Sequence, residues 1–138
     1  MKPKLSKIQP TDSRITVFEH VPLIEGQPTD IFDALVAITR EVLKQSNIVI
    51  GYASATWAQP RFKHYEDHKK LRVKKILIIF KTDNKPDATQ VEAMLIKKFK
   101  SYPNVCNKRS EDRRDDDLND RLYYVYLATE NLPQESIK

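Results

Sequence analysis

The chain has 138 residues, of which 40% are hydrophobic and 31% charged, and its 24 Lys and Arg against 19 Asp and Glu give a net charge of +5. This length suits one domain, and the hydrophobic content is too high for a disordered chain. Gly26 and Gly51 are the only glycines. Because P-loops and dinucleotide-binding turns need two or three closely spaced glycines, both are excluded.

The single cysteine, Cys106, cannot form an internal disulfide, and residues 1–10 lack the apolar stretch of a secretory signal. The longest apolar run, residues 76–80, is much shorter than the roughly 20 residues that span a bilayer. We therefore expect an intracellular protein, cytoplasmic or nuclear, without a membrane partner. The positive net charge is compatible with a polyanionic partner such as nucleic acid.

Hydrophobic periodicity and turn residues predict four strands and three helices in a single domain over residues 15–128. Polar tails are expected at 1–14 and at 129–138, and the first of them is expected to be flexible. The expected strands are 15–18, 48–52, 73–80 and 122–128. The expected helices are 30–45 with Asp30 as N-cap, 61–70 with Pro60 in the first turn, and one that starts at 86 or 87 and ends before Tyr102.

Strands separated by helices indicate an α/β or α+β sandwich. We expect a small central sheet, mixed or antiparallel, of about three to four strands flanked by three helices. Residues 108–121 contain one apolar side chain and predict a charged loop. Asp115 to Asp117 in this loop are flanked by arginines, which favours a solvated segment over a metal cluster.

Arg61, Tyr65 and His68 are spaced i, i+4 and i+7, so a guanidinium, a phenol and an imidazole share one side of the second expected helix. Arg can bind a phosphate in bidentate fashion, and Tyr or His can orient or deprotonate a water. The alternative is a solvated helix face. His64 and His68 have the spacing of a zinc-binding helix, but the acid, Glu66, does not directly follow the first histidine, which argues against zinc.

Glu92 lies beside Ala88 and Ile96 on the third expected helix, at the border of its apolar face. One interpretation is an edge carboxylate that reaches solvent, and the other is a metal ligand or general acid/base. Lys97 and Lys98 follow at the C-terminal end of this helix, where positive charge suits the helix dipole and can also contact phosphates.

Polar residues follow one another in a definite order after residues 49–51, Val-Ile-Gly. A loop leads to a helix with Arg61 and Tyr65, a later helix carries Glu92, and Asn107 comes shortly after it. This succession, over about residues 47–107, resembles the GIY-YIG nuclease family. The resemblance assigns Val-Ile-Gly to the second half-motif and Arg61 with Tyr65 to the catalytic helix.

The sequence departs from the family pattern at Val49, where the family has a tyrosine, and the loop to Arg61 is about two residues longer than usual. Tyr52 would point to the opposite face of the strand and is a poor substitute. The usual first strand is missing upstream, but residues 124–127, Tyr-Val-Tyr-Leu, resemble it. We infer a circular permutation, in which the last strand pairs beside residues 48–51 and Tyr126 takes the place of the first tyrosine.

The resemblance implies hydrolysis of DNA phosphodiesters with Mg²⁺ or Mn²⁺ bound by Glu92. It assigns the orientation or activation of water to Tyr126 or Tyr65, stabilisation of phosphate charge to Arg61, and support of the backbone or metal shell to Asn107. The residues expected to contact nucleic acid are Lys63, His64, His68, Lys97 and Lys98.

Three functions stay open at this point. The first is a metal-dependent DNA endonuclease, and the second is a domain of the same fold that has lost cleavage and binds nucleic acid or protein. The third is an interaction protein that uses the charged loop 108–121 as its contact surface. Because the sequence predicts one domain, we expect a protein partner to supply any targeting to DNA.

Overall fold

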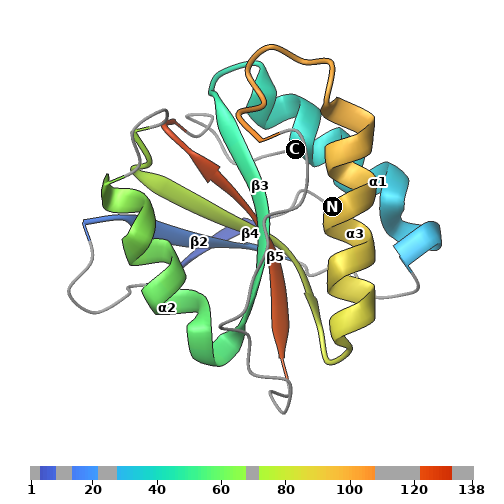
Figure 1. Ribbon diagram of the computed structural model, residues 1–138, viewed down its shortest axis with the longest axis horizontal. Coiled ribbons are helices and arrows are strands. Elements are labelled where there is room, and N and C mark those ends of the chain that lie inside the picture. Colours follow the sequence, from blue (N-terminus) through green and yellow to red (C-terminus); the bar gives the residue numbers. More distant parts are fainter. Residues whose placement is uncertain (1–3, 9–13, 22–27, 68–71, 108–121, 132–138) are drawn as a thin grey trace.

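The computed structural model describes residues 4–8, 14–21, 28–67, 72–107 and 122–131, which form a five-stranded mixed sheet with helices on both faces (Figure 1). The strands are β1 (Lys4–Ile8), β2 (Thr16–Val21), β3 (Ile48–Ser54), β4 (Lys75–Thr82) and β5 (Tyr123–Thr129). The helices are α1 (Pro28–Leu43), α2 (Ala55–His64) and α3 (Lys85–Phe99), and a 3-10 turn, η1 (Tyr65–Asp67), follows α2. The expected α+β class with three helices is confirmed.

The strand order is β1-β2-β4-β5-β3. Strands β4, β5 and β3 are antiparallel neighbours, whereas β2 joins β4 in parallel and β1 pairs antiparallel with β2. The last strand of the chain therefore lies between two earlier strands. Its pairing with residues 48–51, which the permutation hypothesis requires, is observed, and β2 does not occupy that position.

Each face of the sheet has its own core, because side chains alternate along β3 and β5, and along β4 up to the register irregularity between Ile78 and Phe80. Ile50 and Leu127 belong to the core under α1 and α3. Val49 and Tyr126 belong to the core on the other face, under α2. Figure 1 shows α2 on one side of the strands and α1 with α3 on the other. Helices α2 and α3 are thus separated by the sheet.

Helix α1 forms because its apolar residues recur at helical spacing and make one stripe, which is buried against the sheet. Burial of each such side chain contributes about 1.5–3 kcal/mol before entropy is subtracted. Asp30 lies in the first turn and not at the N-cap, and its charge still suits the N-terminal end of the helix dipole. The stripe consists of Ile31, Leu35, Ile38 and Val42.

Helix α3 begins one residue before the expected start, because Asn84 caps it. The Asn84 side chain accepts a hydrogen bond from the backbone N–H of Asp87 at 3.2 Å, and Pro86 follows in the first turn. The buried residues of α3 are Ala88, Val91, Glu92, Leu95, Ile96 and Phe99.

The expected position of the second helix, 61–70, is wrong. Helix α2 ends at His64, and Pro60 lies in its interior and not in its first turn. The helix starts earlier because its apolar stripe includes Ala58, which is buried with Phe62 under the sheet face that holds Tyr126.

Strand β1 lies within residues 1–14, where the sequence predicts a tail. It pairs with β2 from Lys4 opposite Val21 to Ile8 opposite Val17 and adds a strand to the expected three or four. An edge strand is held through backbone groups on one side only, so a strong hydrophobic pattern is not required. No helix among the described segments has the length and apolar character needed to cross a bilayer.

Candidate functional site

Two tyrosines meet between α2 and the centre of the sheet. The hydroxyls of Tyr65 and Tyr126 share a hydrogen bond of 2.9 Å, and their ring centroids are 6.0 Å apart in edge-on contact. Phe62 contacts the Tyr126 ring in a similar edge-on geometry. Both tyrosines are buried, with at most 1% of their surface exposed. The structure therefore brings together two of the expected catalytic residues, in the interior of the protein.

Arg61 of α2 joins this pair from four residues before Tyr65. Its guanidinium carbon lies 5.4 Å from the centroid of the Tyr65 ring, within the range of a cation–π interaction. The side chain is half-buried. Lys63 and His64, on the same helix, are exposed and lie at the surface where a polyanion could contact them.

Gly51 stands opposite Tyr126 in the β3–β5 pair, and the two residues face the same side of the sheet. Glycine has no side chain to compete for the space that the Tyr126 ring fills. Val49 is also on this face, whereas Tyr52 belongs to the core on the other face, as expected from strand alternation. Strand β3 thus has no tyrosine on the sheet face where Tyr126 lies.

Glu92 lies on the other side of the sheet from the tyrosine pair. It is carried by α3, is 0% exposed, and shares the helix stripe that packs on β3 and β5 with Val91 and Leu95. The interpretation of Glu92 as an edge carboxylate that reaches solvent is wrong. Because the sheet lies between α2 and α3, Glu92 and the Tyr65–Tyr126 pair belong to different layers.

Asn107 binds the backbone of β3 at the edge of the sheet. Its Oδ1 accepts from the N–H of Ile50 at 3.0 Å, and its Nδ2 donates to the carbonyl of the same residue at 2.7 Å. The backbone just before Asn107 forms two more hydrogen bonds with β3. The N–H of Ile48 donates to the carbonyl of Asn104, and the N–H of Cys106 donates to the carbonyl of Ile48. Asn107 therefore acts as a backbone clamp on the outermost strand.

The geometry does not favour a Mg²⁺ site at Glu92. Mg²⁺ usually keeps several waters and binds one or two carboxylates together with substrate phosphates, which requires an open site. Glu92 is completely buried, and in the parts of the chain that the structure describes no three His, Cys, Asp or Glu side chains are grouped as metal ligands. We therefore assign no step to a metal ion.

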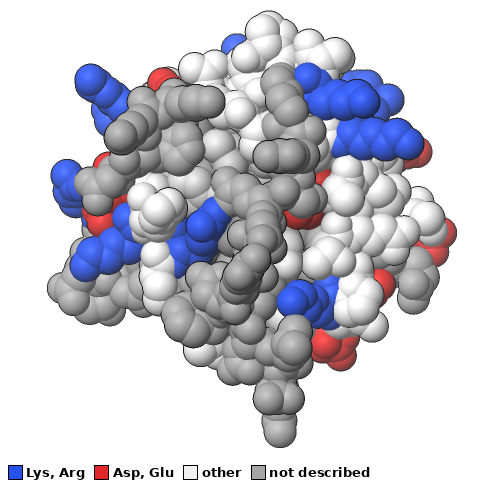
Figure 2. Space-filling view, viewed as in Figure 1, with Lys and Arg blue, Asp and Glu red and all other residues white. Residues whose placement is uncertain are grey.

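Figure 2 shows positive side chains in several regions of one face of the molecule, and two of these regions matter for the site. One region covers the C-terminal end of α3, where Lys97 and Lys98 are exposed, and the other lies over the side of α2. Of the residues expected to contact nucleic acid, Lys63, His64, Lys97 and Lys98 are thus at the surface. His68 lies outside the described residues.

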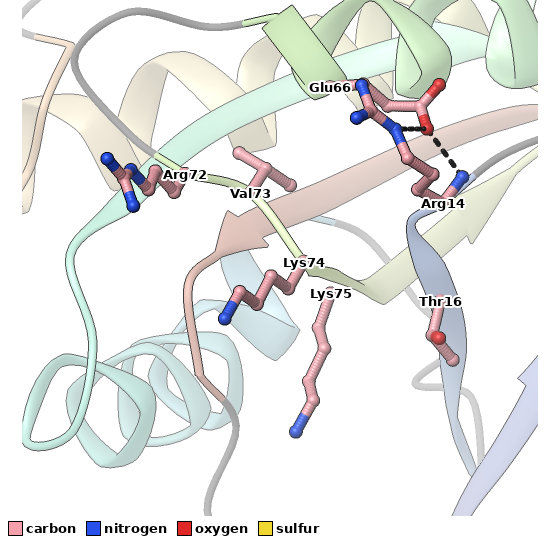
Figure 3. Close-up of a pocket in the computed structure, with 7 residues that line it drawn as sticks. All are labelled: Arg14, Thr16, Glu66, Arg72, Val73, Lys74 and Lys75. Carbon is pink, nitrogen blue, oxygen red and sulfur yellow. Dashed lines mark hydrogen bonds and ion pairs between the residues drawn. The ribbon is translucent and has the colours of Figure 1, made fainter.

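A cationic cavity, which the sequence analysis did not identify, lies where β2 and β4 begin (Figure 3). Its volume is about 650 Å³. The only sequence feature that points to it is the run of basic residues from 69 to 75, and a basic run alone does not predict a cavity. The lining residues are Arg14, Thr16, Glu66, Arg72, Val73, Lys74 and Lys75.

Comparison of the chain with models of known protein families, with curated proteins and with solved structures finds no match.

Proposed function

We propose that the protein is a nucleic-acid-binding domain related to the GIY-YIG fold by circular permutation, and that its activity is binding without cleavage. The observation that carries the proposal is the separation of the expected catalytic groups. Tyr65 and Tyr126 are buried under α2, and Glu92 is buried under α3 on the opposite face. A single phosphodiester cannot reach both layers through the sheet, so the groups cannot act on it together.

Nucleic acid is the partner that the surface charges support. The chain carries a net charge of +5, and Lys63, His64, Lys97 and Lys98 are exposed. Lysines placed in this way attract the phosphate backbone and release its counterions. We place the protein in the cytoplasm or nucleus, where DNA is the first partner to test and a second protein would direct the domain to its target.

Endonuclease activity is the second candidate, because one observation favours it. Strand β5 lies between β4 and β3, and Tyr126 on it meets Tyr65 and, through Tyr65, Arg61. This cluster contains three of the residues to which the resemblance assigns a catalytic role. In the structure the phenols are buried, so hydrolysis would require the layer under α2 to open.

The experiment measures binding and cleavage on the same samples. Labelled linear, nicked and branched DNA is incubated with the protein in Mg²⁺ or Mn²⁺ over a range of salt concentrations, with wild type beside Glu92→Gln and Arg61→Gln. Arg40→Gln, which changes an exposed arginine on α1, is the matched control for Arg61→Gln. Urea unfolding of each variant verifies that it is folded.

The proposal expects salt-sensitive binding and no cleavage above the level of the Glu92→Gln sample. Cleavage by wild type that both Glu92→Gln and Arg61→Gln abolish, with the fold retained and Arg40→Gln active, would establish the endonuclease instead. Absence of binding at low salt would overturn both functions and leave the protein-interaction alternative.

A further inference from the structure

The cavity at the start of β2 and β4 is built by two segments that are distant in the sequence. Thr16 of β2 pairs with Lys75 of β4, and the N–H of Thr16 donates to the carbonyl of Lys74 at 3.0 Å. These contacts place Arg14, just before β2, beside the residues that lead into β4. The cavity therefore depends on the parallel pairing of β2 with β4.

Charge in the cavity is strongly unbalanced. Four of its lining side chains are cationic and one, Glu66, is a carboxylate. Glu66 is bound by Arg14, through the Arg14 backbone N–H and through Nε at 3.0 Å (Figure 3). Among the described residues, Arg72, Lys74 and Lys75 form no ion pair with a carboxylate. Three cations are thus available to an anion.

The positive surface continues from the cavity towards α2. Lys63 is close enough to Glu66 to contribute to lowering the pKa of this carboxyl, although the backbone hydrogen bond from Arg14 is the largest cause. Lys63 is itself exposed. Cations therefore extend from α2 across η1 to the start of β4, which suits a chain of phosphates better than a single ion.

We infer that this cavity binds phosphate groups of a nucleic-acid strand. The inference rests on the proposed function and adds a site to it, because neither Lys97 and Lys98 nor the tyrosine pair contributes to the cavity. Arg72 offers a planar set of donors that can bind a phosphate in bidentate fashion, and Lys74, Lys75 and the Thr16 hydroxyl offer further donors. Val73, the one lining residue with an apolar side chain, is buried.

The start of β2 therefore has a binding role in this proposal. Arg14 and Thr16 belong to the region of β1 and β2, outside both residues 47–107 and the last strand, which carry the family resemblance. Strands β1 and β2 extend the sheet beyond β4, and Arg14 with Thr16 of β2 supplies one wall of the cavity.

A pair of matched double variants tests the site in the full-length protein. Arg72→Gln with Lys74→Gln removes one Arg and one Lys from the cavity, and both are exposed. Arg40→Gln with Lys44→Gln, the α1 variant, removes one Arg from α1 and one Lys from the turn directly after it. Binding of a labelled 12-nucleotide single-stranded DNA is measured by fluorescence anisotropy at several salt concentrations, and amide chemical shifts are followed during titration with pyrophosphate.

The cavity variant is expected to bind the DNA about tenfold more weakly than wild type, with a salt slope that is shallower by about 1, while the α1 variant stays within about twofold of wild type. In wild type, pyrophosphate should shift the amides of Thr16, Lys74 and Lys75. Equal weakening by both double variants would overturn the cavity site and leave the proposed function intact.

Two other outcomes would overturn the inference in different ways. If wild type binds pyrophosphate at the cavity but no DNA or RNA, the occupant is a small phosphate compound, and the proposed function fails as well. If poly-glutamate competes with DNA as well as an unlabelled oligonucleotide does, the cavity selects negative charge and not phosphate.

Discussion

Tyr126 stands directly opposite Gly51 across the β3–β5 pair and extends its hydroxyl to that of Tyr65, the first residue after α2. The smallest residue of β3 thus faces one of the three tyrosines of β5, in the layer where α2 packs. This relationship gives the glycine a packing role. A ring that lies over a glycine in a neighbouring strand covers the backbone that the missing side chain would leave exposed.

Gly51→Ala is expected to destabilise the protein by about 1–3 kcal/mol, because the added methyl group enters the space of the Tyr126 ring. Urea unfolding measures the change. In a Tyr126→Ala background the same substitution should be neutral or stabilising, since alanine normally restricts the unfolded chain more than glycine does. An equal cost in both backgrounds would mean that the two residues are not in steric competition.

Tyr65→Phe and Tyr126→Phe should each destabilise the protein by about 1 kcal/mol, because each removes one partner of a buried hydrogen bond. The double variant should cost clearly less than the two single costs added, since two phenyl rings of the same shape leave no mutual hydrogen bond to lose. Urea unfolding of all four proteins gives the coupling energy. Strict additivity would show that the hydroxyls contribute independently.

The sequence predicts those elements whose apolar stripes are broad. Helices α1 and α3 show a repeat of three and four residues, and both form within about two residues of the expected bounds. Helix α2 was misplaced because Pro60 is as compatible with a first turn as with an interior position, and its apolar stripe is short. Strand β1 gave no signal, because an edge strand is specified by its partner's backbone.

For the candidate site, the sequence predicts one strand pairing but not which layer of the fold holds each residue. The pairing of β5 with β3 follows from the resemblance of Tyr-Val-Tyr-Leu to an opening strand, and it is observed. The layer of Glu92 could not be predicted, because helix periodicity defines which side of α3 is apolar but not which face of the sheet the helix covers. The cavity was missed for a similar reason: Arg14 and Arg72 line the same cavity only because β2 pairs with β4.

Asn107→Ala should destabilise the protein by about 1–3 kcal/mol, because the N–H and carbonyl of Ile50 both lose a hydrogen-bond partner at the edge of β3. Hydrogen exchange at the Ile50 amide should accelerate more than exchange at amides in the centre of the sheet. Asn107→Asp keeps an acceptor for the Ile50 N–H and loses the donor, so it should protect this amide better than alanine does. If exchange at Ile50 is unchanged in Asn107→Ala, the clamp does not stabilise the strand.

The ion pair between Arg14 and Glu66 predicts a pH-dependent contribution to stability. The pKa of the Glu66 carboxyl is held below its ordinary value of 4.5, first by the hydrogen bond from the Arg14 backbone N–H and then by the Arg14 side chain. A carboxyl with a lowered pKa in the folded state stabilises that state above its ordinary pKa, and the contribution is lost as the pH falls through the folded value. The stabilisation should therefore be complete at pH 7 and decline below about pH 4.5.

Glu66→Gln is accordingly expected to unfold at a lower urea concentration than wild type at pH 7, with a difference that shrinks as the pH is lowered below about 4.5. Arg14→Gln should remove part of the same effect, and the double variant should cost less than the two single changes added, because the two side chains act on each other. The Arg14 N–H remains in that variant, so some lowering of the Glu66 pKa should persist. A difference between Glu66→Gln and wild type that stays constant from pH 7 to pH 3 would contradict the linkage and assign the effect of the substitution to packing.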